Sequence, residues 1–192
     1  LLGMNGDVVD VLPSNEVNGT YYGVVTEVGL VTYESSAASS NAEYMLSVAC
    51  TDGVIRQCHV EKDSYSVGAV VSVAYSGGAV EVKRLATSKL SGTVNASANK
   101  LGSYHFADDI EILDVSKEGD WKKILPQRLA GTSLSSGKIC HYALNENGDI
   151  SHLVLNDVTG DMYSYGLLTR AQETENSGVY EYMISGTAGT IN

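Results

Sequence analysis

Two histidines, His141 and His152, are the residues best placed for chemistry in this chain of 192 residues. They belong to two predicted strands, 137–144 and 149–155, which form a hairpin. Any even loop length places both side chains on one face of this hairpin, diagonally across the strand pair. Two imidazoles in this position can bind a transition metal. Cys140 points to the other face, however, and no carboxylate follows at ligand spacing, so we interpret both histidines as ordinary strand residues and expect no metal or cofactor.

Six acidic residues between positions 108 and 120 form a second group whose side chains are of types that catalyse reactions or bind metal ions. Paired carboxylates can act as general acid and base, or they can hold calcium. Here they alternate with Ile110 and Ile112 along a predicted strand, as on the solvated face of a sheet. We therefore expect neither a catalytic nor a metal-binding role for them: Asp108, Asp109, Glu111, Asp114, Glu118 and Asp120.

The motifs of the common enzyme classes are missing from the sequence. It has no glycine-flanked nucleophile, no phosphate-binding glycine loop and no dinucleotide fingerprint. We therefore predict that the chain is not an enzyme and assign no catalytic residue.

Three cysteines, Cys50, Cys58 and Cys140, cannot all be paired within one chain. A tight hairpin turn at Asp52 and Gly53 would place the sulfurs of Cys50 and Cys58 on opposite faces of the sheet, where they cannot be bonded to each other. We therefore expect all three thiols to be reduced, mostly as buried small apolar residues.

Composition and charge exclude several classes of partner. Asp and Glu outnumber Lys and Arg by 23 to 12, and the net charge of -11 repels phosphate backbones and anionic lipids. We therefore expect no nucleic acid and no membrane as a partner. The hydrophobic content of 43% is sufficient for a packed core. Because neither a signal peptide nor an initiator methionine is visible, we interpret the chain as a fragment of a longer protein.

The elements that carry these residues are repeated along the chain. The segment YYGVVTEVG at 21–29 returns as YSYGLLTRA at 163–171, and EYMLS at 43–47 returns as EYMIS at 181–185. The second pair lies slightly closer together in the chain than the first. The difference falls within a loop rich in serine, alanine and asparagine, where changes of length are tolerated. Matched strands around a variable loop indicate a duplication.

A shorter period is also present, because the number of residues between Gly23 and Gly92 equals the number between Gly68 and Gly137. It predicts modules of about 70 residues in two alternating versions. The expected divisions are the terminal strand of a preceding module and a linker (1–16), a first β-barrel module (17–86), a second β-barrel module (87–158) and the opening hairpin of a third, truncated module (159–192).

Each complete module offers five strands with a period-two apolar pattern. A turn at Gly77 and Gly78 pairs Tyr75 with Val80 and Val73 with Val82. The strands are predicted at 21–29, 43–50, 54–60, 69–76 and 79–85 in the first module, and at 89–95, 101–106, 109–115, 137–144 and 149–155 in the second.

A short helix is predicted between the third and fourth strands of the second module, where DWKKILPQRLAG has apolar residues at helical spacing. Three strands, a helix and two strands are the order of a small Greek-key barrel of the oligonucleotide-binding (OB) type. The predicted fold class is therefore all-β, with tandem small five-stranded OB-like barrels and one short helix. An SH3-like barrel and a small sandwich remain alternatives.

The second copy of the repeat predicts an antiparallel hairpin formed by 163–170 and 179–185. A lone hairpin is marginally stable in water. We therefore expect other strands to hold it, from an earlier module, from the segment 1–9 or from a neighbouring chain by strand exchange, which would be a route to self-association.

Three segments, YYGVVTEVG, FADDIEILDV and GDISHLVL, occur within the tandem modules. With these segments and this arrangement, the chain resembles the β-rich regions that accompany S-layer homology domains in surface proteins of Gram-positive bacteria. The S-layer homology motif itself is absent here. The resemblance implies an extracellular, cell-surface location in the bacterial wall and a role as a stalk, spacer or ligand-binding arm. It supplies no catalytic residues.

Two functions follow as expectations. The first is a non-catalytic structural or spacer module of a bacterial cell-surface protein, with another surface protein as a partner. The alternative is a module that binds carbohydrate or cell-wall glycan, because tyrosine rings can stack on sugars. The tyrosines considered for that role are Tyr21, Tyr22, Tyr75, Tyr104 and Tyr142.

Overall fold

The structure is a computed structural model that describes residues 18–31, 43–60, 64–161, 166–173, 180–186 and 189–191. Most of these residues lie in β-strands, and the helices among them are short 3-10 turns. The predicted all-β class is therefore confirmed. The chain divides into two compact units, Leu1–Thr159 and Gly160–Asn192. Within the described residues, no helix has the length and apolar character needed to cross a membrane.

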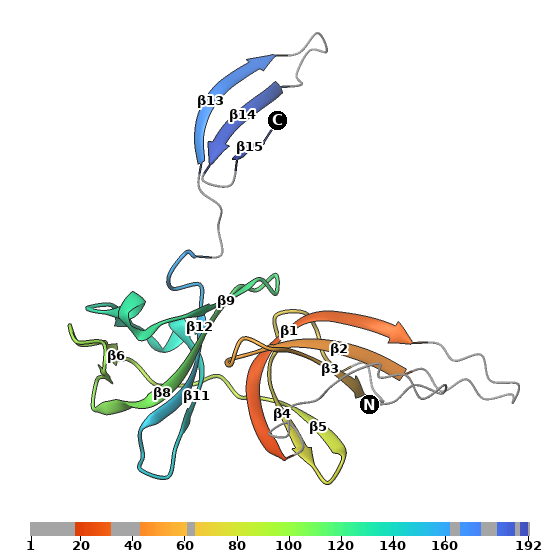
Figure 1. Ribbon diagram of the computed structural model, residues 1–192, viewed down its shortest axis with the longest axis vertical. Helices are drawn as coiled ribbons and strands as arrows, with labels where there is room; N and C mark the ends of the chain where they lie inside the picture. The colour runs from red at the N-terminus through yellow and green to blue at the C-terminus, as the bar shows by residue number, and fades with distance from the viewer. Residues whose placement is uncertain are drawn as a thin grey trace, which may run out of the picture. The chain divides into compact units, whose positions relative to one another are not determined.

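The first unit contains two curled sheets, which Figure 1 shows in red to yellow and in green to blue. The first sheet is antiparallel throughout, with the strand order β3-β2-β1-β4-β5. Its strands match the predicted ones closely: β1 Gly19–Val31, β2 Glu43–Cys50, β3 Ile55–Val60, β4 Val70–Ser76 and β5 Ala79–Arg84.

The hairpin of β4 and β5 has the predicted register. Tyr75 is paired with Val80 and Val73 with Val82. Gly77 and Gly78 both have positive φ angles, 57° and 84°, which a two-residue hairpin turn of this kind requires. The diglycine in the sequence therefore determines how these two strands align.

The hairpin of β2 and β3 differs from its prediction. Leu46, not Ser47, pairs with Cys58, because the loop extends over 51–53 and ends at Gly53 with a φ of +88°. A shift of one residue moves side chains to the other face. Cys50 and Cys58 consequently share one buried face, so the prediction of opposite faces is wrong, whereas the three cysteines are free as expected.

The second sheet has the order β11-β12-β8-β7, and β9 also pairs with β8. Strands β8 and β12 run parallel, and the other pairs are antiparallel. Two very short strands, β6 and β10, pair beside this sheet. The bounds are β6 Gly92–Thr93, β7 Lys100–Leu101, β8 Tyr104–Val115, β9 Trp121–Ile124, β10 Ser133–Leu134, β11 Ile139–Leu144 and β12 Ile150–Asn156.

Two predicted elements of this second half are wrong. The strands expected at 101–106 and 109–115 are largely one long strand, β8, which continues through the exposed pair Asp108 and Asp109. The expected helix is instead β9, followed by a single 3-10 turn, η2 Pro126–Leu129. Proline disfavours helical backbone in the preceding residue, and Leu125 is extended with a ψ of 149°.

Three buried clusters hold the first unit together. One lies within each sheet, and a third joins the sheets to each other. The joining cluster consists of Val24 and Ala49 from the first sheet and Leu113, Val115 and Val154 from the second. A second 3-10 turn, η3 Ser136–Lys138, precedes β11.

The second unit is a three-stranded antiparallel sheet of β13 Gly166–Glu173, β14 Tyr180–Gly186 and β15 Gly189–Ile191. The predicted hairpin is therefore present. The strand beside it is β15, which was not among the strands predicted from the sequence. The predicted strand at 1–9 lies outside the described residues, and the predicted module boundaries stay predictions.

Candidate functional site at the junction of the two sheets

Strand β1 has two apolar faces, and its two adjacent tyrosines lie on opposite faces. The Tyr21 side chain packs with the first core, where the guanidinium carbon of Arg56 lies 3.6 Å from the centre of its ring. Tyr22, on the opposite face, contacts the second sheet. Gly23 follows because a Cβ there would lie 2.2 Å from the carbonyl oxygen of Ala49. The sequence Tyr-Tyr-Gly is thus explained by what each residue contacts.

The ring of Tyr22 packs against both histidines of the β11–β12 hairpin. Its centre lies 5.1 Å from that of His141, in a stacked arrangement, and 5.0 Å from that of His152. His141 is paired with Val154 and His152 with Ala143, so the two imidazoles lie on one face, diagonally across the strands. This placement agrees with the one predicted from the sequence.

A hydrogen-bonded group of three side chains crosses the same junction. The Thr51 hydroxyl, from the end of β2, donates to Oε2 of Glu111 on β8 at 2.9 Å. The Nδ1 atom of His152 lies 3.2 Å from the same Glu111 oxygen and 3.1 Å from the Thr51 oxygen. About a quarter of each side chain of this His–Glu pair is exposed. Polar contacts therefore border the apolar junction.

The environment of the junction shifts two pKa values. Burial opposes the charge of Glu111, but the hydrogen bonds from His152 and Thr51 outweigh it and lower the pKa of Glu111. Burial, together with the nearby His152, lowers the pKa of His141. Near neutral pH the junction therefore contains a charged Glu111 and a neutral His141.

The same geometry does not suit nucleophilic catalysis. In a hydroxyl–histidine–carboxylate relay, the nucleophile and the acid contact opposite ring nitrogens, so that a proton can pass through the ring. Here Thr51 and Glu111 both contact Nδ1 of His152. Thr51 also donates its proton to Glu111 instead of to the imidazole. The arrangement holds two sheets together but does not activate a hydroxyl.

Metal-binding groups are not gathered in the described part of the chain. No cluster of three or more His, Cys, Asp or Glu side chains there has the arrangement of a metal site. His141 and His152 instead pack on the ring of Tyr22, and Glu111 hydrogen-bonds with His152. The histidine pair is thus used for packing across the junction.

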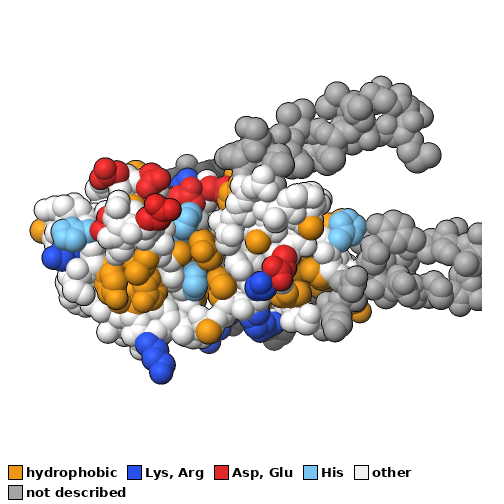
Figure 2. All heavy atoms as spheres, turned by 90° about the horizontal axis from the view of Figure 1, so that it is seen from below, with side chains coloured by type: hydrophobic (Ala, Val, Ile, Leu, Met, Phe, Trp, Pro, Cys, Tyr) orange, Lys and Arg blue, Asp and Glu red, His pale blue; other side chains and the backbone are white. Residues whose placement is uncertain are grey.

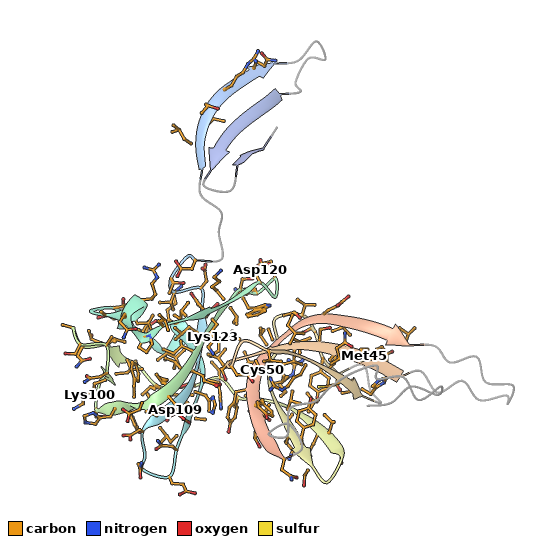
Figure 3. The ribbon with its side chains drawn as sticks, viewed as in Figure 1. Met45, Cys50, Lys100, Asp109, Asp120 and Lys123 are labelled. Atoms are coloured by element: carbon orange, nitrogen blue, oxygen red, sulfur yellow. The ribbon has the colours of Figure 1, made fainter. Side chains whose placement is uncertain are left out.

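The acidic residues of the 108–120 segment do not converge on one site. Figure 3 shows Asp109 and Asp120 well apart, because Asp109 lies within β8 and Asp120 in the turn between β8 and β9. Asp108 and Asp109 are exposed, as expected for a solvated face. Figure 2 shows acidic side chains gathered on one part of the face that it presents, beside histidine and hydrophobic side chains. The sequence did not reveal that Glu111 belongs to the junction.

Asp114 departs from the predicted solvated face, because it is fully buried. Its carboxylate accepts hydrogen bonds from the backbone amides of Val158 and Thr159 and from the Thr159 hydroxyl, at 2.7 to 3.0 Å. These bonds hold the segment after β12 against the second sheet. Asp114 is therefore structural, and the sequence pattern alone did not separate it from its exposed neighbours.

A groove of about 470 Å³ is lined by residues of both sheets and of the segment that connects them. Cys140 lies in this groove, and burial together with the nearby Asp114 raises the pKa of its thiol. A protonated, half-buried thiol is a poor nucleophile. Arg84 and Lys117 also line the groove, but no acid or base accompanies them as a catalytic partner among its described lining residues.

Comparisons of this chain with protein-family models, curated proteins and solved structures give no match. Function is therefore inferred from the geometry of the junction.

Proposed function

We propose that this chain is a non-catalytic structural segment, a spacer, of a bacterial cell-surface protein located outside the cell. The observation that carries the proposal is the junction between the two sheets. Glu111, His141 and His152 are the side chains best suited by type to catalysis or metal binding. Across the junction they contact Tyr22 and Thr51. A spacer needs neighbouring modules to be held at a fixed distance, and these contacts serve that need.

The finer architecture within this proposal is a tandem array of small five-stranded barrels of the OB type. The first sheet supports it, because its order β3-β2-β1-β4-β5 pairs the first strand with the second and fourth, as in an OB-type Greek key. An SH3-like barrel pairs its first strand with its second and fifth instead. The parallel pair of β8 and β12 is consistent with the third and fifth strands of a second OB-type barrel.

The surface location rests on the resemblance to β-rich regions beside S-layer homology domains, and the acidic charge is compatible with it. The partner of a spacer in this setting is another surface protein, whereas a cell-wall glycan is the partner under the second candidate function. Under this proposal the chain uses no cofactor and carries out no reaction.

Glycan binding is the second candidate, and one observation favours it. Tyr104 and Tyr142 are both partly exposed, and their ring centres lie 6.0 Å apart. Aromatic rings at such a spacing can stack on sugars. Tyr21 and Tyr22 are less suitable, since Arg56 and the two histidines lie against their rings.

Binding to a glycan array and to purified cell-wall fragments separates the two candidates. The spacer proposal predicts no saturable binding by the wild-type chain. Saturable binding that is lost in Tyr142→Ala and retained in Tyr142→Phe would contradict the spacer proposal and favour the glycan-binding module. The phenylalanine variant keeps the ring packed on the core of the second sheet, so it separates loss of a sugar contact from loss of folding.

A further inference from the structure

The turn between β8 and β9 of the second sheet packs against an irregularity in β1. The register of β1 with β2 shifts between Val25 and Glu27, so Thr26 is the extra residue of a β-bulge. Gly119, in the turn between β8 and β9, lies against this bulge: a Cβ on Gly119 would be 3.4 Å from the Cα of Thr26. A bulge bends its strand, and here the turn of the neighbouring module lies against the bend.

The same bulge occurs in the second unit. The register of β13 with β14 shifts between Leu168 and Arg170, so Thr169 is the extra residue. Thr169 is also the residue that matches Thr26 when YSYGLLTRA is aligned with YYGVVTEVG on their shared Tyr-Gly pair. Strand β13 therefore shares with β1 the pattern of a glycine, two large apolar residues and a threonine, together with the bulge at that threonine.

The pairing around the bulge is also reproduced. Gly23 pairs with Cys50, and Gly166 pairs with Gly186 at the corresponding place. This alignment puts EYMIS two residues out of step with EYMLS, and a shift by two residues preserves the period-two alternation of a strand. The hairpin of β13 and β14 is thus a structural copy of the hairpin of β1 and β2.

The two copies differ in what covers them. Val24 and Val25 of β1 are fully buried, one in the junction with the second sheet and the other in the first core. Their counterparts Leu167 and Leu168 are 73% and 54% exposed. Adjacent large apolar side chains on opposite faces of a strand mark a strand whose two sides are both to be buried.

The geometry points to the Leu167 face of β13 as a docking surface for a further β-module of the kind formed by residues 92–159. This inference rests on the proposed tandem architecture. The occupant follows from continuity with the existing junction, in which the counterpart Val24 packs with Leu113, Val115 and Val154 of such a module. In the proposed complex, the turn of the further module that is equivalent to 116–120 packs against the bulge at Thr169.

The test extends the chain by its own repeat. In the register of β14 with β15, Ile184 is paired with Ile191, as Val48 is paired with Arg56 in the first sheet, so residues 1–191 can be continued by a second copy of residues 57–159. A matched shorter fusion continues with a second copy of 57–86 only. Hydroxyl-radical footprinting with mass spectrometry then measures the oxidation rates of Leu167 and Leu168 in the original chain and in both fusions.

We expect the shorter fusion to protect Leu168 several-fold, because its barrel is completed, and to leave Leu167 reactive. The longer fusion should protect both residues. If Leu168 is protected in both fusions but Leu167 stays reactive in the longer one, the docking surface is contradicted and the tandem architecture stands. Reactive Leu168 in both fusions would overturn the tandem architecture and the docking surface together. Protection of Leu167 in the original chain would mean that another surface covers it, and would also overturn the inference.

Discussion

The Thr51 hydroxyl donates a hydrogen bond of 2.9 Å to the Glu111 carboxylate and thereby links the first sheet to the second. The two residues are far apart in the chain. Thr51 follows β2 and Glu111 belongs to β8, and both strands contribute side chains to the buried cluster that joins the sheets. A bond between such distant segments contributes to the arrangement of the two sheets as well as to local stability.

Replacing Thr51 by valine tests that contribution. Thr51→Val keeps the shape of the side chain but removes the hydroxyl, so we expect the first unit to lose about 1 kcal/mol of its free energy of unfolding, because the pair is partly exposed. Urea unfolding measures this loss. Thr51→Ser retains the hydroxyl and serves as the control. The serine variant also loses a buried methyl group, worth about 1 kcal/mol, so the valine variant is compared with the wild type. A valine variant as stable as the wild type would show that the bond contributes nothing.

The stability of the first unit should depend on pH through His141. Its pKa is lowered from 6.5 in the folded chain, so the unfolded chain binds more protons as the pH falls below about 6.5, and the folded state loses stability there. Glu111, whose pKa is also lowered, adds a second loss below about pH 4.5. The groups that surround His141 in this titration include His152 and Glu111.

Urea unfolding of the wild-type chain and of His141→Gln between pH 7 and pH 5 checks this dependence. We expect the variant to have a flatter profile than the wild type in that range. Identical profiles would show that His141 is not held neutral by the junction.

Gly23→Ala should destabilise the first sheet. A Cβ at this position would lie 2.2 Å from a backbone oxygen, and only a shift of the neighbouring strand can relieve that overlap. We expect a loss of about 1–3 kcal/mol. Gly137→Ala is the matched control, because nothing lies within 4 Å of its added Cβ, and it should change stability by less than about 0.5 kcal/mol. Equal effects of the two substitutions in thermal unfolding would contradict this explanation.

Asp114→Ala should release the segment that follows β12. The substitution leaves the amides of Val158 and Thr159 without their carboxylate partner, and we expect a loss of about 3 kcal/mol. Amide hydrogen exchange should become faster at those two residues. Asp109→Ala, at an exposed site of the same strand, should leave both measurements nearly unchanged. Unchanged exchange in Asp114→Ala would refute the anchoring role.

Local signals in the sequence predicted much of the first sheet. The diglycine at 77–78 set the register of Val73 with Val82, and alternating apolar residues located the strands. The turn before Val54 was harder, because Asp52 and Gly53 fit loops of two or three residues, and a difference of one residue moved Cys58 to the other face.

The errors in the second sheet came from tertiary pairing that outweighed local pattern. Trp121 and Ile124 have helical spacing, but pairing with Val115 and Ile112 makes the segment a strand. The histidine pair was placed on one face correctly, since a hairpin register is a local property. Its partner Tyr22 lies far earlier in the chain, and no periodicity within one strand could predict that contact.

Residual dipolar couplings of backbone amides in the aligned protein test the central claim most directly. If the junction of Tyr22, Thr51, Glu111, His141 and His152 makes the two sheets one rigid spacer, the couplings of both sheets fit one alignment tensor. The residues to be fitted are 19–31, 43–60 and 64–84 in the first sheet and 92–156 in the second. Two tensors that differ in magnitude or orientation would mean that the sheets move independently. That result would contradict the spacer proposal at the contacts on which it depends.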